Sequence, residues 1–255
     1  MKKAALGIIA IATLIGTPAV AADMLVKAPP LAAPYIWTGC YAGGNIGYSW
    51  GNANSNYDEL FPFLGLPDPI SGTQRLDGII GGGQIGCNWQ ANKTWVLGLE
   101  ADIQGSAERG GSSFSDPFTV VTNGDPILTG TFNTDIQWFG TVRGRIGLLA
   151  TPTLLFYGTG GLAYGGISVS GTNNIGTLML PSFGASAINV GWTVGVGVEG
   201  AIPNTSNWTW KVEYLYIDFG TLSGSGYDPV FAKPYSWSTS VTDNILRVGF
   251  NYRFY

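Results

Sequence analysis

Apolar and polar residues alternate one by one along eight segments of this 255-residue chain, which is the repeat that β-strands show. The segments fall near residues 38–51, 76–90, 95–107, 134–150, 154–170, 188–202, 208–220 and 243–255. In the last segment, one parity holds Leu246, Val248, Phe250, Tyr252 and Phe254, and the other holds Arg247, Gly249, Asn251 and Arg253. A strand that buries one face in a soluble core alternates in the same way. The pattern therefore predicts strands, but it does not choose between a soluble core and lipid.

The connections between these segments alternate in length. Those at 91–94, 151–153 and 203–207 are short, whereas those at 52–75, 108–133, 171–187 and 221–242 are long. Outer-membrane barrels have short periplasmic turns and long external loops, and a soluble sandwich has no reason to place every long loop at one end. The chain is therefore predicted to be all-β, an eight-stranded antiparallel up-and-down transmembrane β-barrel.

The first residues have the features of an export signal. Lys2 and Lys3 are followed by an apolar run at 4–16, and then by the small residues Ala19, Val20 and Ala21. We predict a signal peptide at 1–21 cleaved between Ala21 and Ala22, a Pro-rich periplasmic lead-in at 22–36, and a barrel domain at 37–255. Export followed by insertion predicts the outer membrane of a Gram-negative cell. No other segment reaches the ~18 apolar residues of a membrane helix, so the spanning elements must be strands.

The composition of the chain argues against two classes of function, nucleic-acid binding and catalysis. The formal charge of −4 becomes −6 once Lys2 and Lys3 are removed, because 10 basic residues then face 16 acidic ones. An acidic chain is a poor partner for nucleic acid. The absence of histidine removes Ser–His and Cys–His nucleophiles and the commonest metal ligand. Glu100 and Asp102 have a spacing compatible with acid–base work, but nearby arginines offer them ion pairs. We therefore predict that the chain is not an enzyme and needs neither cofactor nor metal.

The inward parity of the predicted strands carries most of the charge. Because an eight-stranded barrel has an interior just wide enough for side chains to fill, these groups should pair across the lumen. The alternative is that they act as a selectivity filter or gate. The predicted network consists of Glu100, Asp102, Arg143, Arg145, Glu199, Lys211, Glu213 and Arg247, with Arg253 as a further inward base.

Three other groups of residues have expected positions. Cys40 and Cys87 share the outward parity near the periplasmic rim, where they could form a disulfide or lie as two small apolar residues. The predicted external loops carry more acids than bases, with Asp58, Glu59, Asp68, Glu108, Asp116 and Asp125 against Arg75 and Arg109. Aromatic girdles at the two membrane interfaces are predicted from Trp37, Tyr48, Trp50, Trp89, Trp95, Trp138, Tyr164, Trp208, Trp210 and Tyr252.

Several motifs occur in the order of a known family. W-T-G-C-Y at 37–41, G-Y-S-W-G at 47–51, W-F-G-T-V-R-G-R-I-G at 138–147 and K-V-E-Y-L-Y-I-D-F at 211–219 resemble the porin-family outer-membrane proteins with an OmpA-like, opacity-type barrel. Cys40, Cys87 and the extra Tyr255 depart from that pattern.

The resemblance implies a structural barrel that supports envelope integrity and displays recognition loops, with a narrow small-solute porin as the alternative. It implies four kinds of partner: outer-membrane lipid, lipopolysaccharide, the barrel-assembly machinery, and host or environmental ligands at the loops. The expected assembly signal is Phe250, Tyr252 and Phe254, so Phe254→Ala should impair insertion and deletion of Tyr255 should not.

Overall fold

The computed structural model describes residues 35–59, 70–116, 128–175, 178–179, 182–228 and 233–254. Its strands are β1 (Gly39–Glu59), β2 (Ile70–Gln90), β3 (Trp95–Asp116), β4 (Leu128–Thr151), β5 (Leu154–Ile175), β6 (Leu178–Met179), β7 (Phe183–Ala201), β8 (Trp208–Asp228) and β9 (Lys233–Phe254). Among the described residues, no helix is long and apolar enough to cross a membrane.

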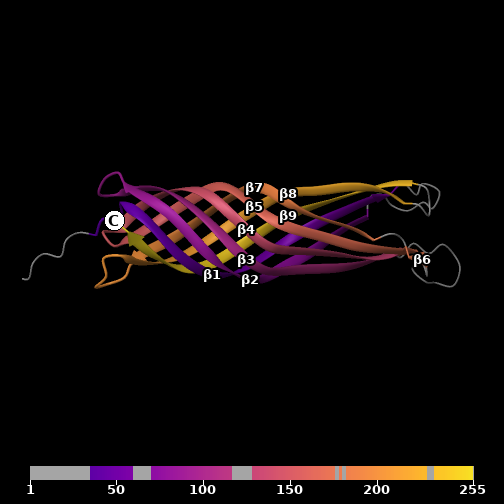
Figure 1. Ribbon diagram of the computed structural model, residues 1–255, viewed down its shortest axis with the longest axis horizontal. Helices are drawn as coiled ribbons and strands as arrows, with labels where there is room; N and C mark the ends of the chain where they lie inside the picture. Colours follow the sequence, from indigo (N-terminus) through magenta and orange to yellow (C-terminus); the bar gives the residue numbers. More distant parts are fainter. Residues whose placement is uncertain are drawn as a thin grey trace, which may run out of the picture. The chain divides into compact units, whose positions relative to one another are not determined.

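The eight long strands close into a ring. Each pairs antiparallel with its neighbour, and β1 pairs with both β2 and β9, while the β4–β5 pairing joins the two ends of the strand order (Figure 1). The two-residue β6 pairs only with the end of β5. In the β1–β9 ladder Cys40 lies opposite Phe254, so the last strand closes the ring against the first. The eight-stranded antiparallel barrel is confirmed.

The short connections lie together at one end of the barrel, as predicted. They join β2 to β3, β4 to β5 and β7 to β8. In the first, the Asn92 side-chain oxygen accepts hydrogen bonds from the backbone N–H groups of Thr94 and Trp95, at 2.8 and 2.9 Å. In the third, Asn204 has φ 61°, a left-handed conformation that asparagine tolerates better than most residues. β9 also finishes at this end, with Phe254 (Figure 1).

An apolar belt surrounds the half of the barrel nearest the short turns. Its side chains point outward and stay exposed although they are large and apolar, which only an apolar surrounding makes favourable. Aromatic residues, among them Tyr48, Trp50, Trp192 and Tyr214, mark its far edge. The belt includes Ile46, Ile79, Ile85, Leu97, Leu99, Ile103, Val142, Ile146, Leu162, Ile188, Val190, Val194, Val196, Leu246, Val248 and Phe250.

The strands continue well beyond this belt, which corrects the predicted loops. The alternation predicts loops at 52–75 and 108–133, but β1 extends to Glu59, β2 begins at Ile70 and β3 extends to Asp116. Beyond the belt the two faces exchange polarity: Ala53 and Tyr57 are buried inside, whereas Asn54 and Asn56 are exposed outside. A prediction based on outward apolar residues therefore ends each strand at the edge of the belt.

Bulges accompany this exchange of polarity. The β4–β5 register shifts between Ile136 and Trp138, and the β8–β9 register shifts between Asp218 and Thr221. An extra residue lets two side chains an odd number of residues apart point to the same face. Phe139 and Ile136 both lie inside the barrel for this reason, as do Phe219 and Leu222. The bulges thus keep apolar side chains pointing into the lumen at the level where the inner face of the wall changes from polar to apolar.

Candidate functional site

The lumen is filled by three successive layers, and the first closes the end with the short turns. Trp37 precedes β1 and is fully buried against Val96, Leu155 and Tyr157, so the prediction that it belongs to an outer girdle is wrong. Its indole N–H donates to the Pro152 carbonyl at 3.1 Å, and its backbone N–H donates to the Gln90 side chain at 3.0 Å. The segment before β1 therefore plugs this mouth of the barrel, because its aromatic side chain finds apolar neighbours only inside.

The second layer contains all eight residues of the predicted charge network. Arg143 donates to Glu213 at 3.0 Å and to Asp102 at 2.9 Å, and it also contacts Glu100. Arg247 bridges two of the same carboxylates, Glu213 at 2.6 Å and Asp102 at 2.9 Å. None of the eight side chains is more than 5% exposed. Four acids and four bases make the layer formally neutral, which is what allows so many charges to be buried together.

The remaining members complete the layer. Lys211 lies 2.9 Å from Glu100, and Arg145 lies 2.7 Å from Glu199. Two tyrosines that the sequence analysis did not single out also take part: the Tyr41 hydroxyl donates to Glu100 at 2.6 Å, and the Tyr157 hydroxyl donates to Glu213 at 3.0 Å. Every carboxylate of the layer is thus already engaged by a base, which leaves none free for acid–base chemistry.

The third layer is apolar and fills the half of the lumen beyond the belt. Its side chains come from six of the long strands, so they meet only when the ring closes. The alternation does not predict this layer, because some of its residues fall in the segments that are predicted to be loops. It comprises Ala53, Tyr57, Leu76, Ile80, Phe132, Ile136, Phe139, Ala163, Ile167, Val169, Leu215, Ile217, Phe219, Leu222, Trp237, Val241 and Ile245.

Two carboxyl groups are buried between the second and third layers. Glu108 is 1% exposed and Asp243 is fully buried, and the two carboxyl groups lie close enough together for each to affect the charge of the other. The expectation that Glu108 lies in an external loop is therefore wrong, because β3 carries it into the lumen. Parity alone would have predicted this position had the strand been extended past residue 107. The described residues include no base within ion-pairing distance of either carboxyl group.

The outer wall beyond the belt is covered with hydroxyl and amide groups. The hydroxyls of Thr131 and Thr172 lie 2.9 Å apart across β4 and β5, and those of Thr221 and Ser240 lie 2.9 Å apart across β8 and β9. A groove of about 620 Å³ crosses β8, β9 and β1 on this wall. It is lined by Asn56, Asp58, Ser223, Gly224, Ser225, Ser236, Trp237 and Ser238.

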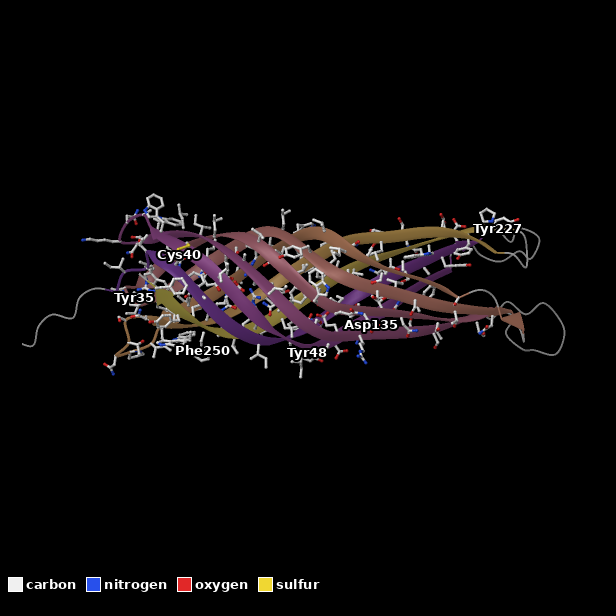
Figure 2. All side chains as sticks on the ribbon, viewed as in Figure 1. Tyr35, Cys40, Tyr48, Asp135, Tyr227 and Phe250 are labelled. Carbon is white, nitrogen blue, oxygen red and sulfur yellow. A yellow bond between two sulfur atoms is a disulfide. The ribbon has the colours of Figure 1, made fainter. Side chains whose placement is uncertain are left out.

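The two cysteines and the last strand lie near the end with the short turns. Cys40 and Cys87 are opposite each other in the β1–β2 ladder and are joined by a disulfide bond (Figure 2). Phe250, Tyr252 and Phe254 all point outward from β9, and the Tyr252 ring packs edge-on against Trp208 at 5.2 Å between centroids. Ala21, Ala22 and Tyr255 lie outside the described residues. Their expected roles in cleavage and assembly stay predictions.

The described residues contain no group of three or more His, Cys, Asp or Glu side chains that could hold a metal ion.

A closed ring of antiparallel strands, with an apolar belt outside and charged side chains inside, defines a transmembrane β-barrel. The model of the family described as "Outer membrane protein beta-barrel domain" matches residues 19–254, and the chain belongs to this family. It therefore lies in the outer membrane, with its short turns on the periplasmic side.

Relatives support this assignment. The 31 kDa outer-membrane immunogenic protein of Brucella melitensis is 39% identical, and the match covers 96% of this chain and 97% of the relative. The 22 kDa outer membrane protein of Rhizobium leguminosarum bv. viciae is 30% identical, with 88% and 82% covered. Among solved structures, the outer membrane protein OprG from Pseudomonas aeruginosa is similar at 11% identity and a TM-score of 0.47, covering 87% of this chain and 99% of that one.

Proposed function

We propose that this protein is a closed structural barrel of the outer membrane that supports envelope integrity and presents its outer wall for recognition. The observation that carries the proposal is the filled lumen. The neutral charge layer of Glu100, Arg143 and their partners lies between the plug formed by Trp37 and the apolar third layer. A solute would have to displace ion pairs and packed aromatic rings in succession, so the proposal favours a structural barrel over a small-solute porin.

The outer wall supports the recognition part of the proposal. Exposed polar side chains continue along the strands past the belt, and Tyr227, which is 62% exposed, lies near the far end of the barrel (Figure 2). The Brucella relatives are named for being immunogenic, which for this chain would follow from display of this wall outside the cell. Lipopolysaccharide surrounding the wall and ligands from the host or environment are the partners it would meet. The barrel-assembly machinery would act earlier, on the unfolded chain.

No catalytic role enters the proposal. The carboxylates of the charge layer are committed to bases, and the chain contains no histidine that could activate a nucleophile.

The proposal is tested by recording single channels from the refolded protein in planar bilayers. We expect no stable open state, because the side chains of three successive layers pack across the lumen. A steady, ohmic channel in the wild-type protein would contradict the closed barrel. In liposome swelling, Arg143→Ala should remain as impermeable as the wild type or lose its fold. Faster swelling at unchanged stability would instead identify the charge layer as a gate.

The envelope role needs a separate test. A strain without this protein should become more sensitive to detergent, and expression of the wild-type chain should restore resistance. Unchanged detergent resistance in the deletion strain would remove the envelope role and leave display as the function.

A further inference from the structure

The buried carboxyl groups of Glu108 and Asp243 differ from every other inward charge described in this barrel. The acids of the charge layer each have a basic partner, whereas these two acids face one another. A buried carboxylate without a counter-charge is strongly unfavourable, and a buried pair of carboxylates is more so. The pair must therefore be neutralised in part by something other than a side chain.

The immediate surroundings supply hydrogen-bond donors but no positive charge. The Asp243 carboxylate accepts the Ser49 hydroxyl and, at 2.9 Å, the backbone N–H of Asn244. The Glu108 Oε1 atom accepts the Ser106 hydroxyl at 2.9 Å, while Glu108 Oε2 is buried without a donor. A proton on Glu108 would let this carboxyl group donate a hydrogen bond to the neighbouring Asp243 carboxylate, so that the two groups share one proton.

The charged or titratable inward groups nearest the pair lie in the layers on either side of it. Towards the periplasm, the inward groups are those of the charge layer, and Arg247, the base nearest to Asp243 along β9, is bound to Glu213 and Asp102. Towards the outside, the inward groups are the stacked Tyr57 and Tyr235, with 5.7 Å between ring centroids. The described inward residues of β2, β4, β5 and β7 at this level are not ionisable.

The charges near Glu108 on the other face do not reach the pair. Arg109 points outward with 86% of its side chain exposed, and it lies 4.0 Å from Asp135. Asp77 accepts the Tyr48 hydroxyl on the outer face of β2. Figure 2 shows Asp135 farther along the barrel than Tyr48, on the external side of the aromatic edge of the belt. Glu108, which pairs with Ile136, is thus at the external side of the membrane-spanning segment.

Close backbone approach makes room for the two carboxyl groups. A Cβ atom on Gly78 would lie 2.7 Å from the backbone nitrogen of Glu108. A Cβ atom on Gly51 would lie 2.9 Å from the Asp243 carboxylate oxygen Oδ1. Glycine at both positions lets β2 and β1 approach the pair without a side chain between them. The space for the pair is therefore formed by the backbone itself.

We propose that Glu108 and Asp243 form a proton-binding site that ties β3 to β9 across the external half of the lumen. One proton lies between the two carboxyl groups, and Glu108 donates it to the Asp243 carboxylate. When the proton is lost to solvent, two like charges are left in a buried, largely apolar space. The site therefore makes the closure of the lumen sensitive to pH, in addition to the structural role proposed above.

The direction of the pH effect follows from the burial of both groups. Burial, and after it the neighbouring Asp243 charge, together raise the pKa of Glu108 to about 8. Burial also raises the pKa of Asp243 above its ordinary value. An unfolded chain releases these protons near pH 4. Because the folded state then binds more protons than the unfolded state, folding stability falls as pH rises from there to about 8 and levels off above it.

The experiment measures urea unfolding of the barrel in lipid vesicles at about pH 5 and about pH 9. We expect the wild-type equilibrium constant for unfolding to rise at least about tenfold between the two conditions. Glu108→Gln keeps a donor for Asp243 and cannot ionise, so only the smaller response of Asp243 should remain, and the unfolding constant should change several-fold less than in the wild type. Asp135→Asn is the matched control, because it removes an exposed acid near the same level and should keep the wild-type response.

A second readout does not depend on the variants folding. The infrared band of a protonated carboxyl group should be present in the wild-type protein at neutral pH and should disappear at about pH 10. Its absence at neutral pH would overturn the proposal. An equal pH response of unfolding in the wild type and in Glu108→Gln would overturn it as well. Both results leave the closed-barrel proposal intact, since that proposal depends on channel recordings.

Discussion

At the scale of single residues, Arg143 shows how the lumen charges hold the barrel together. Its guanidinium group reaches three carboxylates, carried by β3 and β8, and all of them are buried. The parity of the sequence predicts that these side chains face inward, but which acid meets which base depends on how far each strand is shifted against the next. Parity likewise does not predict that Glu108 and Asp243, which also face inward, have no basic partner.

Replacing Arg143 by methionine should destabilise the barrel by about 3–5 kcal/mol, because it leaves Glu100, Asp102 and Glu213 with one positive charge fewer in a buried layer. Urea unfolding in lipid vesicles would measure this difference. Arg109→Met is the control: its side chain is 86% exposed, so the free energy of unfolding should change by less than about 0.5 kcal/mol. Equal effects of the two substitutions would mean that the buried network contributes no more than a surface pair.

At the scale of strands, the ends of the elements were harder to predict than the elements themselves. The alternation located all eight long strands, and their periplasmic ends agree closely with the sequence, as at Trp95, Leu154 and Trp208. The external ends were missed because the outward residues become polar there, as Asn54 and Asn56 do, while the strands continue to pair.

The disulfide between Cys40 and Cys87 joins β1 to β2 at the periplasmic end, and it closes a loop with a sequence separation of 47 residues. Replacing both cysteines by alanine should therefore lower the free energy of unfolding by about 2–4 kcal/mol, mainly by freeing the unfolded chain. Unfolding of the two forms in urea would measure the loss.

Thiol labelling provides the control for this prediction. The wild-type protein, unfolded without reductant, should show no reactive thiol, and the same protein after reduction should show two. Two reactive thiols before reduction would show that the bond does not form in the cell.

At the scale of the whole barrel, the strand extensions change which sites a protease can reach. Arg75 and Arg109 are exposed, and the predicted loops at 52–75 and 108–133 would place them in accessible connections. In the structure both lie on strands, with Arg75 opposite Asn52 and Arg109 opposite Asp77 and Asp135. Proteases cut unpaired segments far more readily than paired strands.

Trypsin added to intact cells should therefore leave the chain uncut at Arg75 and Arg109, and mass spectrometry of the peptides would show it. The same protein unfolded in urea should be cleaved at both residues. Rapid cleavage at Arg109 in intact cells would show that β3 and β4 separate outside the membrane.

The sequence by itself determined the class of fold. Eight segments alternate apolar and polar residues, and short and long connections alternate between them. In lipid every backbone hydrogen bond must be made within the protein, and a closed antiparallel barrel is the architecture that meets this requirement with such segments. The sequence also determined that the eight charges of the predicted network face inward, since parity does not depend on register. Only the tertiary structure decided the pairing of Arg143 with its three acids, the burial of Trp37 and the isolation of Glu108 with Asp243. These depend on contacts across a closed ring between residues far apart in the chain, and a local pattern contains no information about what lies on the opposite wall.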